Sequence, residues 1–165
     1  MADQIPIEKL QPCLLDRLTD DEPTVKEESR AQRVVSLQKY RLGVLRDLEW
    51  LFNSQPCLDF GDGDFSLKDY PEAFKSVINY GTRQLSGVTS PNSEHLQEEL
   101  SRAIELFEPR IMAHGLAVHA DIERNVLTFE IRGDLWANPV PEQLHLKSSV
   151  DLEIGQCVIG DSLHG

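Results

Sequence analysis

The simplest chemistry available to this sequence is hydrolysis by paired carboxylates. Two carboxyl groups about 5–10 Å apart suffice for glycoside hydrolysis, and Glu105 and Glu108 lie three residues apart in a segment with helical spacing. That spacing places both on an ordinary helix surface rather than across a cleft. Sugar sites also need aromatic platforms, whereas aromatic residues make up only 7% of the chain. We therefore expect no enzymatic activity and no catalytic residues, and keep a muramidase as the enzymatic alternative.

The most distinctive local feature is Glu108-Pro109-Arg110, which joins the last predicted helix to the first predicted strand. Pro109 fixes the backbone between two opposite charges. One interpretation is a helix stop with a surface ion pair worth at most about 1 kcal/mol. The other is a rigid charged corner presented to another protein, to which arginine makes two parallel hydrogen bonds. The residues alone leave both open. We expect the pair to be exposed in the free protein, so that Arg110→Ala hardly changes the melting temperature.

Motifs for metals and cofactors are incomplete. An Asp-Phe-Gly triplet begins at Asp59, but the glycine-rich and His-Arg-Asp loops of a kinase are missing. Asp59, Asp62 and Asp64 suggest a calcium loop, yet the twelfth position counted from Asp59 is Tyr70, where a glutamate is required. The five histidines show no zinc-ligand spacing, and no phosphate-binding glycine motif occurs. The sequence predicts no cofactor and no metal.

The composition limits the class of partner. The 165 residues include 16 Lys and Arg against 28 Asp and Glu, a formal charge of −12. So acidic a chain is unsuited to nucleic acid, whose phosphates require clustered positive charge, and is repelled by anionic membranes. No run approaches the roughly 20 apolar residues of a membrane span, and Met1–Pro6 lacks the features of a signal peptide. Three widely spaced cysteines form no CxxC pair, which favours a reduced cytoplasmic protein.

Hydrophobic spacing predicts the elements that position the corner. Residues 31–53 form the longest predicted helix, because apolar residues recur on one of its faces: Leu37, Tyr40, Val44, Leu48 and Leu51. A helix of about three turns is predicted from Pro71 to a terminating Gly81. A third begins at Ser90-Pro91 and ends at Glu108, since Pro109 disfavours helical backbone in the residue before it.

Alternating apolar residues predict the strands. Residues 116–122 and 127–131 alternate on either side of a short turn, which indicates a hairpin, and 144–154 alternate as a third strand. We predict an α+β fold in which three or so helices pack on one face of a small antiparallel sheet of about three strands.

The domain organisation follows from the same pattern. Residues 1–30 read as an N-terminal arm, interrupted by the apolar cluster within Leu14–Leu18, which we expect to dock on a partner or on the protein's own core. Residues 31–155 form the domain and 156–165 a C-terminal tail. Deletion of residues 1–20 is expected to leave the domain folded.

Five short stretches, in order, resemble the TssE family of lysozyme-like baseplate subunits of the bacterial type VI secretion system, within the family of the contractile-phage baseplate wedge protein. The stretches are 14–21, 46–53, 76–81, 104–111 and 150–155. After Asn79-Tyr80-Gly81 that family often continues with Pro-Asp, whereas Thr82-Arg83 follows here. The resemblance covers about residues 12–155.

The resemblance implies a structural baseplate role without hydrolysis. It implies assembly with the wedge proteins TssF and TssG in the cytoplasm, at the inner-membrane-associated baseplate, and contact with contractile sheath subunits. It also implies that Glu108, Pro109 and Arg110 bind the helical core bundle of the wedge. A sheet edge, near 115–122 or 144–154, is expected to accept a sheath strand. The alternative binding module is an anti-adapter of stress-response proteolysis, which shares the wider fold but lacks the arm signature at 14–21.

Overall fold

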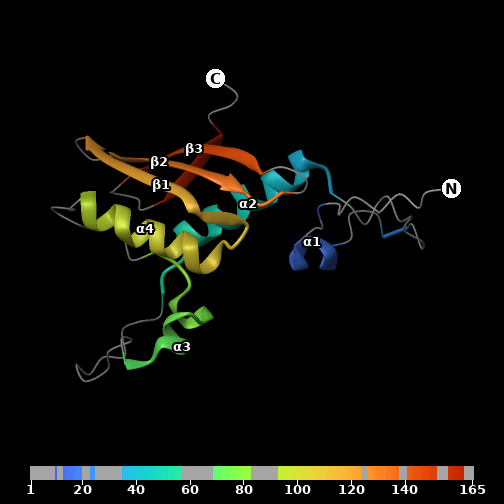
Figure 1. Cartoon of the computed structure of the whole chain (residues 1–165), viewed down its shortest axis with the longest axis horizontal. Helices are drawn as coiled ribbons and strands as arrows, with labels where there is room; N and C mark the ends of the chain where they lie inside the picture. Colours follow the sequence, from blue (N-terminus) through green and yellow to red (C-terminus); the bar gives the residue numbers. More distant parts are fainter. Residues whose placement is uncertain are drawn as a thin grey trace.

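The computed structural model describes most of the chain, and the predicted α+β class is confirmed. The described residues are 10, 13–19, 23–24, 35–56, 69–82, 93–123, 126–137, 141–151 and 156–161. Within them, helices lie on one face of a four-stranded antiparallel sheet of order β1-β2-β3-β4 (Figure 1). The helices are α1 (Leu14–Leu18), α2 (Leu37–Asn53), α3 (Pro71–Phe74), the 3-10 helix η2 (Val77–Asn79) and α4 (Ser93–Phe107). The strands are β1 (Ile111–Glu123), β2 (Val126–Leu135), β3 (Glu142–Asp151) and β4 (Cys157–Asp161).

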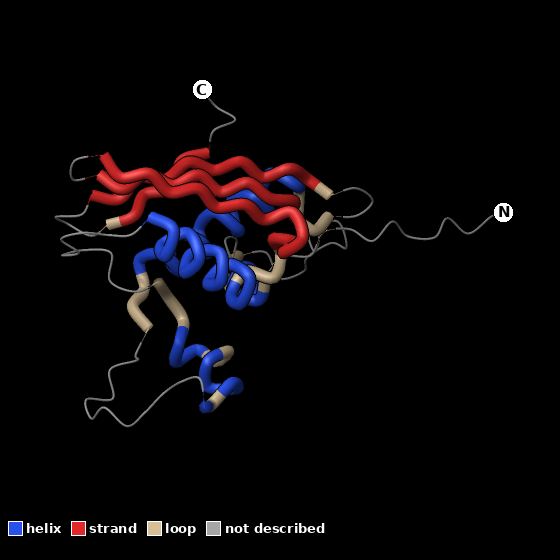
Figure 2. The backbone as a smooth tube through the Cα atoms, turned by 60° about the vertical axis from the view of Figure 1, so that its left-hand side comes forward, coloured by secondary structure: helices blue, strands red, loops and turns tan. Residues whose placement is uncertain are grey.

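The core lies between the sheet and the two long helices, α2 and α4 (Figure 2). Along β2 the side chains alternate between buried and partly exposed, and the buried ones face the helices. Phe129 of β2 meets Phe52 of α2 edge to face, with ring centroids 5.2 Å apart. α4 packs on β1 and ends at Phe107, where Pro109 predicts the stop. The two helices that flank the corner are therefore held rigidly on the sheet.

The predicted hairpin is present and longer than expected. β1 and β2 pair from Glu123↔Val126 back to Ile111↔Leu135, with an irregularity between Met112 and Ala117. Between these two pairs β1 contains five residue steps, from Met112 to Ala117, whereas β2 contains only two, from Asp134 to Arg132. The pairing carries β1 back to Ile111, directly after the corner.

The expected C-terminal tail contains a strand. β4 pairs with β3 from Val150↔Cys157 to Leu146↔Asp161, and the Cys157 side chain is buried. The Asn53 side chain at the end of α2 fastens β4, because its Oδ1 accepts from Cys157 N at 2.9 Å and its Nδ2 donates to Cys157 O at 3.0 Å. The prediction of β3 as an open edge is therefore wrong over 146–150. β4 escaped detection because it is only five residues long and contains a glycine.

The helix predicted from Pro71 to Gly81 is broken into α3 and η2. Ser76 interrupts it, since its Oγ donates to Ala73 O at 2.7 Å and accepts from Ile78 N at 3.3 Å. Gly81, at its end, has a φ of 126°, and a Cβ there would lie 2.3 Å from Ser54 O. The glycine that the sequence placed at the stop is thus required by both backbone conformation and space. The acidic loop around Asp59, Cys57, and the end of the predicted third strand, 152–154, lie outside the described residues.

Candidate partner-binding site

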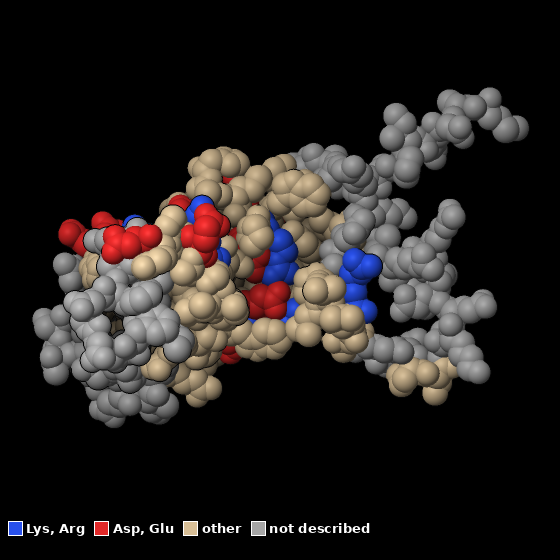
Figure 3. Space-filling view, turned by 90° about the horizontal axis from the view of Figure 1, so that it is seen from below, with Lys and Arg blue, Asp and Glu red and all other residues tan. Residues whose placement is uncertain are grey.

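Basic and acidic side chains meet on the face seen from below the sheet, where blue and red atoms lie side by side across the middle of the surface (Figure 3). The Glu108-Pro109-Arg110 corner connects α4 to β1. Glu108 N still donates to Ile104 O at 2.8 Å, and Ile111 N donates to Glu108 O at 3.1 Å as β1 begins. The sequence placed the corner correctly between helix and strand. Its expected exposure is wrong, because Glu108 is only 3% exposed.

Glu108 is buried because Arg110 neutralises it within the same chain. Arg110 Nε donates to Glu108 Oε1 at 2.6 Å, Nη2 forms an ion pair with Glu108 Oε2, and the Arg110 backbone N donates to Glu108 Oε1 at 3.3 Å. Arg110 Cζ also lies 6.0 Å from the centre of the Tyr40 ring. Burial alone would lower the pKa of Arg110, but the hydrogen bonds and charges of Glu108 and Asp47 raise it, so the guanidinium stays charged.

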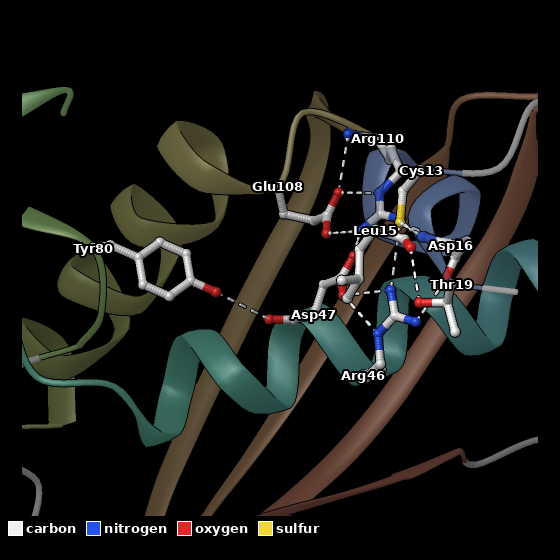
Figure 4. Close-up of polar contacts among 9 residues, drawn as sticks. All are labelled: Cys13, Leu15, Asp16, Thr19, Arg46, Asp47, Tyr80, Glu108 and Arg110. Atoms are coloured by element: carbon white, nitrogen blue, oxygen red, sulfur yellow. Dashed lines mark hydrogen bonds and ion pairs between the residues drawn. The ribbon is translucent and has the colours of Figure 1, made fainter. Parts of the chain in front are cut away.

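Asp47 of α2 extends this pair into a network (Figure 4). Its Oδ2 accepts from Arg110 Nη2 at 2.6 Å, while its Oδ1 accepts from Arg46 Nε at 2.9 Å and pairs with Arg46 Nη2 at 2.8 Å. One carboxylate therefore serves both arginines. The Cζ atom of Arg46 in turn lies 5.2 Å from the centre of the Trp50 ring, one turn further along α2. No buried side-chain polar atom among the described residues is left without a hydrogen-bond partner.

The N-terminal arm joins the network through α1. Asp16 Oδ1 accepts from Arg46 Nη1 at 2.6 Å, and Cys13, the N-cap residue of α1, donates from its thiol to Asp16 Oδ2 at 3.0 Å. Burial alone would raise the pKa of Asp16, but the hydrogen bonds from Arg46 and Cys13 outweigh it and lower that pKa. The arm therefore contacts the chain's own domain, but through Cys13 and Asp16. The expected docking of the apolar cluster on the core is wrong, because Leu14, Leu15 and Leu18 are 70%, 40% and 74% exposed.

A pocket of about 450 Å³ lies between α1, α2 and the corner. Its wall residues are Cys13, Leu15, Trp50, Leu51, Tyr80, Phe107 and Pro109, with Asp47, Glu108 and Arg110 as its charged part. Tyr80 and Phe107 pack edge to face with centroids 5.3 Å apart. The pocket is therefore mainly aromatic and aliphatic, beside charged groups that are already paired within the chain.

The described residues hold no group of three or more His, Cys, Asp or Glu side chains that is arranged to bind a metal ion. His119 is exposed on the outer face of the sheet, and His145 forms an ion pair with Glu130 on the next strand. Both therefore lie on the polar strand face, as the alternation predicted.

Comparison with known families decides the broad identity. The model of the baseplate wedge protein gp25 family matches residues 38–140, more than half of the chain. The chain belongs to this family. A search of the curated proteins found no match.

Family membership gives the chain a structural role in a baseplate, in contact with other baseplate proteins. The match includes Arg46, Asp47 and the corner, whereas α1 lies outside it. Sequence reasoning selected the corner and missed Asp16, Arg46 and Asp47 as its partners, although these residues lie within the stretches 14–21 and 46–53 that carry the resemblance. No helix among the described residues has both the length and the apolar character needed to cross a membrane.

Proposed function

We propose that this protein is a wedge subunit of a type VI secretion baseplate, of the TssE type. It assembles with TssF and TssG in the cytoplasm, at the inner-membrane-associated baseplate, and connects the wedge to contractile sheath subunits. The family match supports the baseplate role, and the five stretches in order support the type VI assignment. We propose further that it is not an enzyme.

The observation that carries the proposal is the surface around the corner. The chain has two tryptophans, and both flank the corner: Trp50 lines the pocket beside Pro109, and Trp136 N donates to Arg110 O at 2.7 Å. Trp50 is 49% exposed and Trp136 is 52% exposed. Tryptophan and arginine are the residues most enriched in the energetic centres of protein interfaces. A stiff polar centre flanked by two half-exposed indoles fits a protein partner.

Contact with the sheath is assigned to β1. In the described part of the sheet, β1 pairs with β2 on one side and has no neighbour on the other. An open edge accepts an added strand through backbone hydrogen bonds. The candidate edge at 115–122 therefore remains, whereas β3 is covered by β4 over 146–150.

The test is co-purification of the tagged protein with TssF, TssG and the sheath subunits after co-expression. We expect a wedge complex, and expect Trp136→Ala to weaken it by about tenfold or more, as a central interface tryptophan does. Val126→Ala is the control, since Val126 is 43% exposed at the first residue of β2, whereas Trp136 follows the last residue of that strand. Absence of any complex with the wild-type protein would refute the proposal. Digestion of purified cell wall, lost on replacing one carboxylate, would instead support the muramidase.

A further inference from the structure

α1 is held in place by polar side chains rather than by apolar burial. None of its five residues is buried, and Leu14 and Leu18 are 70% and 74% exposed. An isolated helix of this length is not stable in water. The polar contacts that attach it to α2 are those of Asp16 and Cys13 with Arg46, at 2.6 Å and 3.4 Å.

The same contacts connect α1 to the corner. Arg46 binds Asp16 through Nη1 and Asp47 through Nε and Nη2, and Asp47 binds Arg110. Charges therefore alternate without a gap from α1 through α2 to the corner. Arg46 and Asp47 lie on a rigid helix packed on the sheet, so they fix where α1 sits relative to Arg110.

Asp16 of the arm and Arg110 of the corner both lie over the same residue of α2, Gly43. A Cβ at Gly43 would lie 3.4 Å from Asp16 Oδ2 and 3.8 Å from Arg110 Nη1. The carboxylate of the arm and the guanidinium of the corner thus cover the same point of α2. A larger side chain at this position would occupy the place of Asp16.

In this position α1 forms one wall of the pocket. Cys13 and Leu15 line it together with Trp50 and Phe107. The charged groups beside the pocket are paired with one another, since Asp47 and Glu108 both bind Arg110. An apolar side chain would bury aromatic and aliphatic surface in the pocket, whereas a charged ligand would have to compete with the ion pairs that Asp47 and Glu108 already form with Arg110.

We propose that α1 is a clasp that completes a partner-binding pocket beside the corner, with Asp16, Arg46 and Asp47 as its positioning residues. The occupant is a large apolar side chain of the wedge partner. This inference rests on the proposed function, and it extends the site from three residues to a surface formed by α1, α2 and the corner.

The test compares Asp16→Ala with Arg17→Ala in the full chain. Arg17 is the exposed neighbour of Asp16 on the same helix and serves as the matched control. Hydrogen exchange of the amides of residues 13–19 measures docking of α1 without any partner. Affinity for a purified TssF–TssG complex measures the site, and a melting curve confirms folding of each variant.

We expect Asp16→Ala to raise amide exchange in α1 and to weaken TssF–TssG binding, each about tenfold, because it removes hydrogen bonds to a charged group. Arg17→Ala should change neither. For the occupant, Trp50→Ala should weaken binding while Leu42→Ala, which removes an exposed side chain of α2 outside the pocket, should not.

The outcomes separate the inference from the proposed function. Unchanged exchange in Asp16→Ala would overturn the clasp, whatever the partner does. Faster exchange with unchanged affinity would show that α1 docks without serving the site, which also overturns it. If the wild-type protein does not bind TssF–TssG, the proposed function fails and the inference with it, even where the exchange data show a docked α1.

Discussion

Arg110→Ala removes the guanidinium that neutralises the buried carboxylate of Glu108. Glu108, whose side chain is 4% exposed, loses both side-chain contacts with Arg110, and Asp47 keeps only Arg46. Removing one partner of a buried ion pair costs about 3–5 kcal/mol, because the remaining charge stays buried and unpaired. Since the Arg110 side chain is itself 19% exposed, we take the lower end, about 3 kcal/mol. For a chain of this size that lowers the melting temperature by about 6–12 °C.

The chain contains a matched control for this change. Arg132 forms the same Glu-x-Arg pair with Glu130, with Nη2 to Oε1 at 2.9 Å, but its side chain is 65% exposed on the outer face of the sheet. An exposed pair of this kind contributes about 1 kcal/mol or less. Arg132→Ala should therefore lower the melting temperature by no more than about 4 °C.

Thermal and urea unfolding of the isolated protein at neutral pH measure both variants. Arg110→Lys should lose about half as much stability as Arg110→Ala, because an ammonium cannot bind both carboxylates with the geometry of a guanidinium. Glu108→Gln in the Arg110→Ala background should recover more than about 1 kcal/mol, since it removes the unpaired charge. If Arg110→Ala is no more destabilising than Arg132→Ala, the corner is not an internal clamp, and burial of Glu108 does not make its ion pair with Arg110 stronger than an exposed pair.

Three further changes test other parts of the molecule. Gly81→Ala should destabilise the protein by about 2 kcal/mol or more, measured by urea unfolding, because it combines a positive φ with a Cβ 2.3 Å from Ser54 O. Gly43→Ala is the matched control: its Cβ would meet its nearest atom at an ordinary 3.4 Å, and alanine is the better helix former, so stability should stay unchanged or rise by up to about 1 kcal/mol. The pKa of Asp16 is lowered on folding, so its contribution to docking of α1 is present above the unfolded pKa of about 3.9 and is lost as the pH falls below that value. The NMR chemical shifts of the backbone amides of residues 13–19 should therefore change below about pH 4 in the wild type but not in Asp16→Ala. Of His119 and Ala120, consecutive residues of β1, one directs its N–H to β2 and the other directs its N–H to the open edge. Proline at whichever of the two points to the open edge should weaken sheath binding and leave the melting temperature unchanged. Equal loss of sheath binding and TssF–TssG binding would point to misfolding.

The elements that the sequence predicted well are those whose signals are local. α2 presents the predicted apolar face, and α4 ends where Pro109 makes helical backbone unfavourable. The hairpin between β1 and β2 follows from strict alternation. The break between α3 and η2 was missed because Phe74, Val77 and Ile78 have helical spacing. The competing hydrogen bonds of Ser76 interrupt that helix, and both Val77 and Ile78 remain exposed.

The site was only half predictable for a different reason. The identity of the corner residues is visible in the chain, but their burial depends on Asp47, 63 residues before Arg110, and the position of the arm depends on Arg46, 30 residues after Asp16. No periodicity connects such distant charges. An acidic chain offers many carboxylates as partners for each arginine, and only the packing of α2 against the corner selects among them.

The internal clamp changes how the corner must act on a partner. Arg110 already binds Glu108 and Asp47, so a partner that took its guanidinium would have to break those contacts and leave Glu108 buried without a counter-charge. The structure therefore favours a corner whose contribution is stiffness. Ordering a side chain at an interface costs about 0.5–1.5 kcal/mol, and in this protein folding has already ordered the charged centre. Affinity should then come from the half-exposed indoles and the pocket around that centre. At temperatures below the melting transition of each variant, Trp50→Ala should accordingly weaken TssF–TssG binding more than Arg110→Lys does. A larger loss of affinity in Arg110→Lys would instead show that Arg110 binds the partner directly.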